Sequence, residues 1–176
     1  MRWMWIDRIV ELVPAKRAVS IKGVTLAEEQ MHDHFAAVPG RSALPIFPAT
    51  LIIEGIAQTA GILLGHASGF KEKVVLAKVS LAELDREVGP GQTLRYTVEI
   101  KQMDRAGAAT SGLVEVMDHG ASSNVFQPIG RVDLLCSQID HNMAGMEFPS
   151  HNFVFSEAFQ TLLRMSGVEV MPEQNA

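Results

Sequence analysis

The longest mainly apolar stretch of the chain runs from Ala49 to about Ser68. Three polar side chains spaced by four residues, Thr50, Glu54 and Gln58, break its surface. On a helix this spacing keeps them near one face, while the apolar remainder predicts burial on most other faces. Its apolar run from Ala49 to Gly65 is shorter than the roughly 20 residues that a bilayer requires, and it contains a carboxyl group. The pattern therefore predicts the central helix of a folded domain rather than a transmembrane span.

The remaining apolar patterns predict strands on both sides of this helix. Residues 18–26 alternate Val19 and Ile21 with Ser20 and Lys22, which indicates a strand with one apolar and one polar face. Residues 28–35 indicate a short helix or turn, and 36–47 an irregular loop rich in Pro and Gly. The other predicted strands are residues 3–13, hairpinned to the strand at 18–26, and, after the helix, 74–81, 94–100, 111–117 and 130–139.

One long helix among antiparallel strands is typical of an α+β domain whose sheet must bend around the helix. Ser156 is a candidate N-cap of a second helix that ends near Gly167, and we expect this helix to pack on the outside of the sheet. The predicted organisation is one domain over residues 1–142, followed by an extension over residues 143–176 that packs on the same domain.

Composition narrows the class of protein. The formal charge is −5 and the pI about 5.6, which argues against nucleic-acid binding. Cys136, the single cysteine, lies in an apolar strand pattern and is expected to pack as a small apolar residue. Asp7 and Arg8 interrupt the apolar N-terminus before a signal peptide could form. These features predict a cytoplasmic protein without membrane segments.

The polar residues near the central helix carry the candidate chemistry. Glu is rarely buried unless it is paired or takes part in chemistry, so Glu54 requires an explanation. Three places in the chain carry a resemblance to a known family. These places are His34-Phe35, Pro39-Gly40-Arg41 and the stretch from Pro45 to Gln58 (PIFPATLIIEGIAQ), which contains Glu54. In them the chain resembles the β-hydroxyacyl-acyl-carrier-protein dehydratases of fatty-acid synthesis. Their signature is His-Phe-Pro-Gly, Pro-x-x-Pro-Gly, and a helix with Glu or Asp followed by Ala-x-x-Gln. The resemblance covers about residues 5–139.

The resemblance implies a hot-dog fold, in which a bent antiparallel sheet wraps a long helix, and dehydration of (3R)-hydroxyacyl thioesters to trans-2-enoyl thioesters. It places His34 as the catalytic base and Glu54 as the acid or water-positioning group. These types of residue suit the reaction, because His titrates near neutral pH and a carboxyl group can protonate a leaving hydroxyl. The backbone N–H of Ala49, at the start of the helix, is the expected donor to the thioester oxygen.

The resemblance also implies partners. The substrate is an acyl-carrier-protein or CoA thioester, no cofactor or metal is implied, and the chain forms a homodimer, possibly a trimer of dimers. The two catalytic residues of a site come from different subunits. Gln58 and Asp33 are expected next to the catalytic groups. The residues expected to line or border an apolar tunnel at the dimer interface are Phe35, Ile46, Phe47, Leu51 and Ile52.

The sequence departs from the family between the two catalytic residues. Residues 36–38 and 42–44 form extra triplets on either side of Pro39-Gly40-Arg41. Six added residues cost little in loop entropy but are enough to displace His34 by several ångströms, more than catalytic geometry tolerates. His32 is a competing base in this region. A metal site built on His32, His34 and Glu28 or Glu29 lacks any recognised ligand spacing.

Two other functions fit the same residues. A hot-dog acyl thioesterase would use Glu54 to activate water or attack the thioester carbonyl, and it would not need His34. A non-catalytic acyl-thioester-binding protein would have its His34 moved out of reach by the longer loop.

Overall fold

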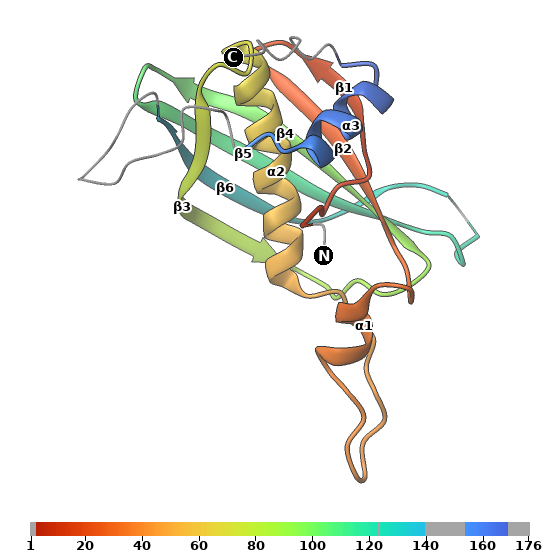
Figure 1. Ribbon diagram of the computed structural model, residues 1–176. Helices are drawn as coiled ribbons and strands as arrows, with labels where there is room; N and C mark the ends of the chain where they lie inside the picture. Colours follow the sequence, from red (N-terminus) through yellow and green to blue (C-terminus); the bar gives the residue numbers. More distant parts are fainter. Residues whose placement is uncertain (1–2, 123, 140–153, 169–176) are drawn as a thin grey trace.

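One six-stranded antiparallel sheet wraps around a long helix, α2, in the computed structural model (Figure 1). The structure describes residues 3–122, 124–139 and 154–168. The strand order is β1-β2-β4-β5-β6-β3, so β1 and β3 form the two edges. The strands are β1 (Arg8–Val13), β2 (Arg17–Val24), β3 (Lys73–Leu84), β4 (Gln92–Met103), β5 (Gly107–Asp118) and β6 (Gln127–Ile139), and the helices are α1 (Glu29–Asp33), α2 (Ala49–Ala67) and α3 (Glu157–Met165).

The central helix and the α+β, hot-dog arrangement predicted from the sequence are confirmed. Helix α2 is long and apolar enough to span a membrane by length and composition, but 61% of that window is buried inside the fold. It contacts five of the six strands, β2 to β6. Four strands follow the helix and two precede it, in the predicted order. A helix that is apolar on most faces has been buried by bending one sheet around it.

The bend of the sheet has local causes in the strand register. Register shifts occur in β1 between Ile9 and Glu11, and twice in β3, between Leu76 and Lys78 and between Val79 and Leu81. Others lie in β4 and at the pairing of β5 with β6. Such bulges bend a strand and increase its twist. They allow twelve-residue strands to follow the curved surface of α2.

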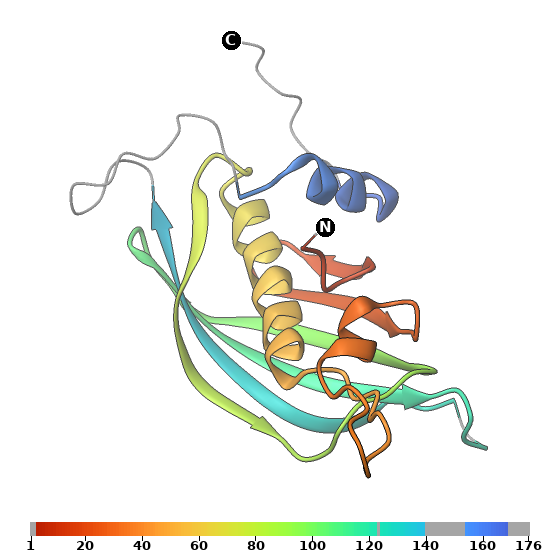
Figure 2. The ribbon, with the colours of Figure 1, turned by 60° about the horizontal axis from the view of Figure 1, so that its bottom comes forward.

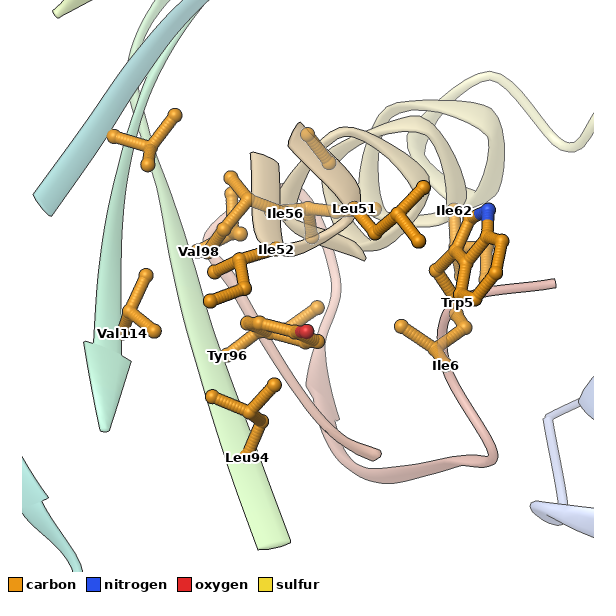
Figure 3. Close-up of a cluster of buried hydrophobic side chains, with 14 of the residues drawn as sticks. Trp5, Ile6, Leu51, Ile52, Ile56, Ile62, Leu94, Tyr96, Val98 and Val114 are labelled. Carbon is orange, nitrogen blue, oxygen red and sulfur yellow. The ribbon is translucent and has the colours of Figure 1, made fainter. Parts of the chain in front are cut away.

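Two glycines let the helix and the sheet approach each other closely. A Cβ at Gly55 would lie 2.5 Å from the ring of Tyr96 on β4, which is fully buried. A Cβ at Gly112 on β5 would lie 2.8 Å from Ile56. Figure 3 shows Tyr96 beneath α2, among the buried side chains of both layers. Burial raises the pKa of the Tyr96 hydroxyl well above its ordinary value, so the ring stays neutral in the core.

The polar face predicted for β2 turns toward the interior. Ser20 is fully buried, and Lys22 has a relative exposure of 7%. The Ser20 hydroxyl lies 2.6 Å from the hydroxyl of Thr59 on α2, which in turn donates to the carbonyl of Gly55. Buried polar groups are tolerated when they are hydrogen-bonded to each other. The strand is confirmed, and its polar residues Ser20 and Lys22 are buried because their partners lie on distant elements.

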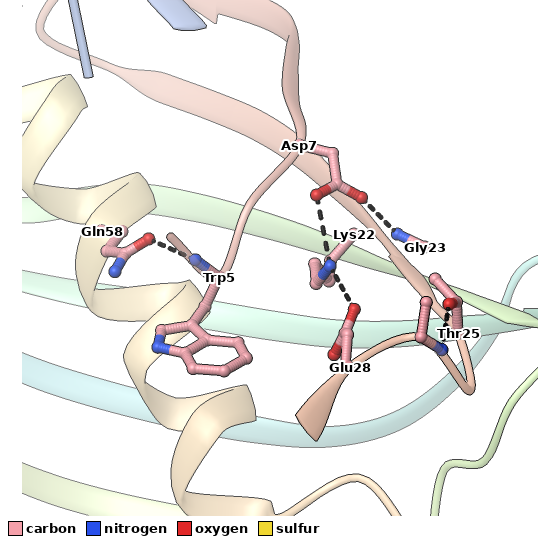
Figure 4. Close-up of polar contacts among 8 residues, drawn as sticks. Trp5, Asp7, Lys22, Gly23, Thr25, Glu28 and Gln58 are labelled. Atoms are coloured by element: carbon pink, nitrogen blue, oxygen red, sulfur yellow. Dashed lines mark hydrogen bonds and ion pairs between the residues drawn. The ribbon is translucent and has the colours of Figure 1, made fainter. Parts of the chain in front are cut away.

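The N-terminal segment is shorter as a strand than predicted. Residues 3–7 lie outside β1, which begins at Arg8. The backbone N–H of Trp5 donates to the side-chain oxygen of Gln58 on α2, at 2.8 Å (Figure 4). Trp5 and Ile6 are buried against the helix. The aromatic and β-branched residues that suggested a strand instead cover one side of α2.

The C-terminal helix α3 packs beside β1 and the N-terminal segment (Figure 2). The hydroxyl of Ser166 accepts a hydrogen bond from the N–H of Ile9 at 3.0 Å, which occupies a backbone donor of the edge strand. Leu162 and Leu163 are buried with the main core. The predicted boundary between residues 142 and 143 lies outside the described residues.

The close contact at Gly55 predicts a stability difference between two glycines of α2. In Gly55→Ala the new methyl group overlaps the buried Tyr96 ring, and overpacking costs about 1–3 kcal/mol. In the control variant Gly61→Ala, the methyl group meets no described atom within 4 Å, and alanine favours a helix by up to about 1 kcal/mol over glycine. Urea unfolding should show Gly55→Ala less stable, and Gly61→Ala at least as stable, as the wild type. Equal stability of the two variants would contradict this packing.

Candidate active site

His34 follows directly after the short helix α1. It takes the C-cap position, and its backbone N–H donates to the carbonyl of Gln30 at 3.2 Å. The imidazole is exposed and packs edge-on against the ring of Phe35, with 4.4 Å between centroids. Helix α1 is only five residues long, so its position depends on contacts with the rest of the fold.

A buried ion pair supplies one such contact. The ammonium of Lys22 on β2 lies 2.6 Å from the carboxylate of Glu28, the residue that precedes α1. Asp7 lies 3.3 Å from the same ammonium, and its other oxygen accepts the N–H of Gly23 (Figure 4). The side chains of Lys22 and Glu28 are only 9% and 16% exposed. This network ties α1, and therefore His34, to β2 and the N-terminal segment.

The added loop residues form a projecting hairpin (Figure 1). The carbonyl of Phe35 accepts the N–H of Leu44 at 3.0 Å, so the ends of the insertion are held together. Val38 and Arg41 pair across the hairpin, and Gly40 takes a left-handed conformation at its tip. The extra length therefore extends away from the fold, and His34 still lies beside the start of α2.

His34 lines a cavity of about 480 Å³ at the N-terminus of α2. Phe35, Ile46, Phe47 and Ile52, all expected in the tunnel, also line this cavity. The fifth expected residue, Leu51, is buried in the core and faces Trp5 and Ile6 (Figure 3). The opposite wall is formed by residues 84–88, between β3 and β4. Phe47 connects the two walls by donating its N–H to the carbonyl of Val88 at 2.7 Å.

The first turn of α2 offers backbone donors to the His34 cavity. Pro48 is the N-cap, and its carbonyl accepts the N–H groups of Leu51 and Ile52 at 2.9 and 3.3 Å. Ala49 and Thr50 line the cavity, and their N–H groups belong to the first turn, which has no acceptors within the helix. The positive end of the helix dipole points the same way. This arrangement can stabilise a negatively charged oxygen near His34.

Glu54 lies in a second cavity, also of about 480 Å³, on another side of α2. Its Oε1 accepts hydrogen bonds from Gln58 at 2.9 Å and from the indole N–H of Trp3 at 3.2 Å. Gln58 also donates to the carbonyl of Trp3 and accepts the N–H of Trp5. Both hydrogen bonds to Glu54 end on Oε1, so among the described contacts Oε2 is the carboxyl oxygen that is left to meet a ligand. Sequence reasoning missed Trp3, whose only signal was the pair of tryptophans preceding β1.

One chain places His34 and Glu54 in separate cavities. Glu54 follows Ala49 by five residues, which on an α-helix turns it by about 140° and moves it ~7.5 Å along the axis. Ala49 belongs to the His34 cavity, whereas Glu54 belongs to the cavity beside Trp3. Each cavity thus holds one of the two side chains that the resemblance predicts to be catalytic.

The other candidate residues lie elsewhere. His32 hydrogen-bonds the carbonyl of Leu26 at 2.5 Å and lines a different depression, beside Lys22. Asp33 is exposed at the end of α1. Cys136 is buried, and desolvation raises the pKa of its thiol to about 11, which keeps it protonated at neutral pH. Among the described residues, no group of three or more His, Cys, Asp or Glu side chains could hold a metal ion.

Comparison with known proteins adds a family. Residues 2–120 match the FabA-like domain family. The chain is 40% identical over 103 residues to the 3-hydroxyacyl-acyl-carrier-protein dehydratase FabZ of Cereibacter sphaeroides, a match that covers 57% of this chain and 63% of that protein. It is 36% identical over 117 residues to FabZ of Symbiobacterium thermophilum, covering 66% of this chain and 78% of the relative.

Solved structures with the same fold have diverged far in sequence. The dehydratase heterocomplex ApeI:P from Xenorhabdus doucetiae matches with a TM-score of 0.56 at 15% identity, covering 78% of this chain and 84% of that chain. An acyl-CoA hydrolase variant from Staphylococcus aureus matches with a TM-score of 0.55 at 13% identity, covering 86% and 87%. At these identities the similarity concerns the fold alone.

The ion pair at α1 predicts a stability effect that is specific to one of two adjacent glutamates. Glu28→Ala leaves Lys22 buried with only the longer contact to Asp7, and breaking a buried pair costs about 3 kcal/mol. The exposed neighbour Glu29 is the matched control, and Glu29→Ala should change stability by less than about 0.5 kcal/mol. Urea unfolding of both variants measures the difference. Equal losses would mean that Glu28 does not anchor α1.

Proposed function

The chain belongs to the FabA-like domain family, and from that premise we propose that it dehydrates (3R)-3-hydroxyacyl thioesters to trans-2-enoyl thioesters and water, in fatty-acid or related acyl-chain synthesis. The observation that supports the proposal is that helix α2 contributes to both the His34 cavity and the Glu54 cavity. His34 shares a cavity with Ala49 and Thr50 of the first turn of α2, and Glu54 lines a cavity farther along the same helix.

The proposed reaction assigns one step to each group. The imidazole of His34 removes the proton from the α-carbon, and the electron pair of that C–H bond forms the α,β double bond. The β-hydroxyl leaves as water with a proton from the Glu54 carboxyl group. Negative charge that builds on the thioester oxygen is stabilised by the N–H of Ala49 and the helix dipole. Trp3 and Gln58 hold Oε1 of Glu54, which directs Oε2 toward the substrate.

A complete site on this proposal needs two copies of the chain. His34 and Glu54 line separate cavities in one chain, and the family resemblance assigns them to different subunits of a dimer. Strand β3 is a twelve-residue edge whose Leu76 and Val79 are 44% and 39% exposed. Leu76 also lines the Glu54 cavity. Pairing at this edge would cover apolar surface and bring a second chain beside Glu54.

We propose an acyl-carrier-protein or CoA thioester as the substrate in a cytoplasmic homodimer. Arg86 lines the His34 cavity and is a basic contact for the negative charge of a carrier, between Asp85 and Glu87 of the same wall. Two other basic residues are less available to a carrier. Lys73 is buried, and Lys101 pairs with Glu99 at 2.7 Å.

Substitution of the two groups tests the reaction. His34→Ala and Glu54→Gln should each lower hydration of a short trans-2-enoyl-CoA by about 10²–10⁴-fold, the usual contribution of a general acid or base. His32→Ala, two residues from His34 and outside its cavity, should retain activity. Absorbance of the enoyl thioester follows the reaction, and circular dichroism checks the fold.

Other outcomes of this experiment would overturn the assignment. Release of free thiol from saturated acyl-CoA that survives His34→Ala would show the thioesterase, which the isolation of Glu54 from His34 in one chain makes the second candidate. Retained acyl binding without turnover in the wild type would show a binding protein. Equal loss in His32→Ala and His34→Ala would remove the specific role of His34.

Mixing the two inactive variants tests whether the site is shared. A mixed dimer of His34→Ala with Glu54→Gln contains one doubly altered site and one intact site if each site uses two subunits. After subunit exchange at equal amounts, half the dimers are mixed, so activity should return to about a quarter of wild type. Hydration rates before and after exchange give the measurement. No recovery, with exchange verified by mass spectrometry, would place both groups of each site on one chain.

A further inference from the structure

The Glu54 cavity has a wall that the family match does not account for. Its lining includes Val154, Phe155, Ala158 and Phe159, all beyond residue 120, where the match to the FabA-like family ends. They also lie beyond β6, the last strand of the sheet. The C-terminal segment therefore closes a cavity whose other walls come from α2, β3 and the N-terminal segment.

This wall is fixed to the fold rather than resting on it. The ring of Phe155 is 6% exposed and packs edge-on against Phe70, with 4.9 Å between centroids. It occupies space over Gly65 of α2, where any side chain would overlap the ring. Phe159 packs edge-on against Phe155 at 6.4 Å. Helix α3, which contains Phe159, is held by its buried leucines and by the Ser166 hydrogen bond to β1. Closely packed aromatic rings make a stiff boundary.

The cavity has a polar and an apolar part. Glu54, Gln58 and Gly61 follow each other along the side of α2 that lines the cavity. Gly65, which the ring of Phe155 covers, is the next residue on that side. The distance along the helix axis from Glu54 to Gly61 is therefore ~10 Å. Trp3, Glu54 and Gln58 supply the polar groups, whereas Val74, Leu76 and the phenylalanines are apolar. A cavity of about 480 Å³ with one polar end is of a size that holds a small ligand.

We propose that residues 154–159 form the end wall of the acyl-chain site and restrict the substrate to short and medium acyl chains. An extended peptide spans at most ~3.6 Å per residue, which corresponds to three covalent bonds along the chain. An extended acyl chain of similar bonds therefore advances ~1.2 Å per bond, and about eight carbons cover the distance from Glu54 to Gly61. The inference rests on the proposed function, because it takes the Glu54 cavity as the place of the acyl chain. Phe159 is then a residue that determines specificity and takes no part in the chemistry.

Binding of saturated acyl-CoAs of four to sixteen carbons tests the wall without turnover by dehydration. Trp3 lines the cavity and is one of only two tryptophans in the chain, so fluorescence can report occupancy. In the wild type, affinity should rise about fourfold per added methylene and stop rising near eleven carbons, because C3 lies at Glu54 and about eight further carbons reach Gly61. Phe159→Ala should extend the rise by about two carbons and bind a fourteen-carbon chain roughly tenfold more tightly than the wild type. Ala158→Phe should end the rise at a shorter chain.

The matched control is Phe126→Ala, which removes a phenyl ring that lies under Arg95, away from this cavity, and should leave the length limit unchanged. A wild-type affinity that keeps rising to sixteen carbons would overturn the proposal, as would an unchanged limit in both Phe159→Ala and Ala158→Phe. The enoyl hydration assay separates the two proposals. A length limit without hydration refutes the dehydratase alone, whereas hydration without a length limit refutes the wall alone. Free thiol is monitored in parallel, so that hydrolysis of the acyl-CoA is not mistaken for weak binding.

Discussion

The structure depends on the burial of an apolar helix by a single bent sheet. Helix α2 is too apolar to leave exposed, and one flat sheet could cover only one of its sides. Bulges in β3 and β4 bend the sheet, and Gly55 and Gly112 allow the two layers to touch. The sides of α2 that the strands do not reach are covered by the N-terminal segment and by Phe155 of the C-terminal segment. The candidate site lies where this covering is incomplete.

The same constraint decides which features the sequence could predict. Helix α2 and the later strands follow from local periodicity, because burial acts on every third or fourth residue of a helix and every second residue of a strand. The faces of β2 could not be predicted, since Ser20 and Lys22 are buried only because Thr59 and Glu28 reach them from distant parts of the chain. The start of β1 was misjudged for a similar reason, because Gln58 binds the backbone of Trp5.

The candidate site follows the same division. His34, Ala49 and Glu54 could be named because their residue types are close to a family signature along the chain. The roles of Trp3 and Phe159 required the structure, since no local pattern tells which cavity a terminal aromatic ring will line. The hairpin after His34 is an intermediate case. Its extra length could be predicted from the sequence. The hydrogen bond from the N–H of Leu44 to the carbonyl of Phe35, which holds the two ends of the hairpin together, could not.

The two edges of the sheet are treated differently by the chain. On β1 the N–H of Ile9 donates to Ser166 of the C-terminal segment, although both edges carry exposed apolar side chains, Val10 and Val13 on β1 and Leu76 and Val79 on β3. A sheet with one free edge strand can pair with one other sheet, and it then has no free edge left to pair with a third sheet. In the proposed dimer, where β3 is the paired edge, the contact of the C-terminal segment with β1 would work against further growth along the sheet.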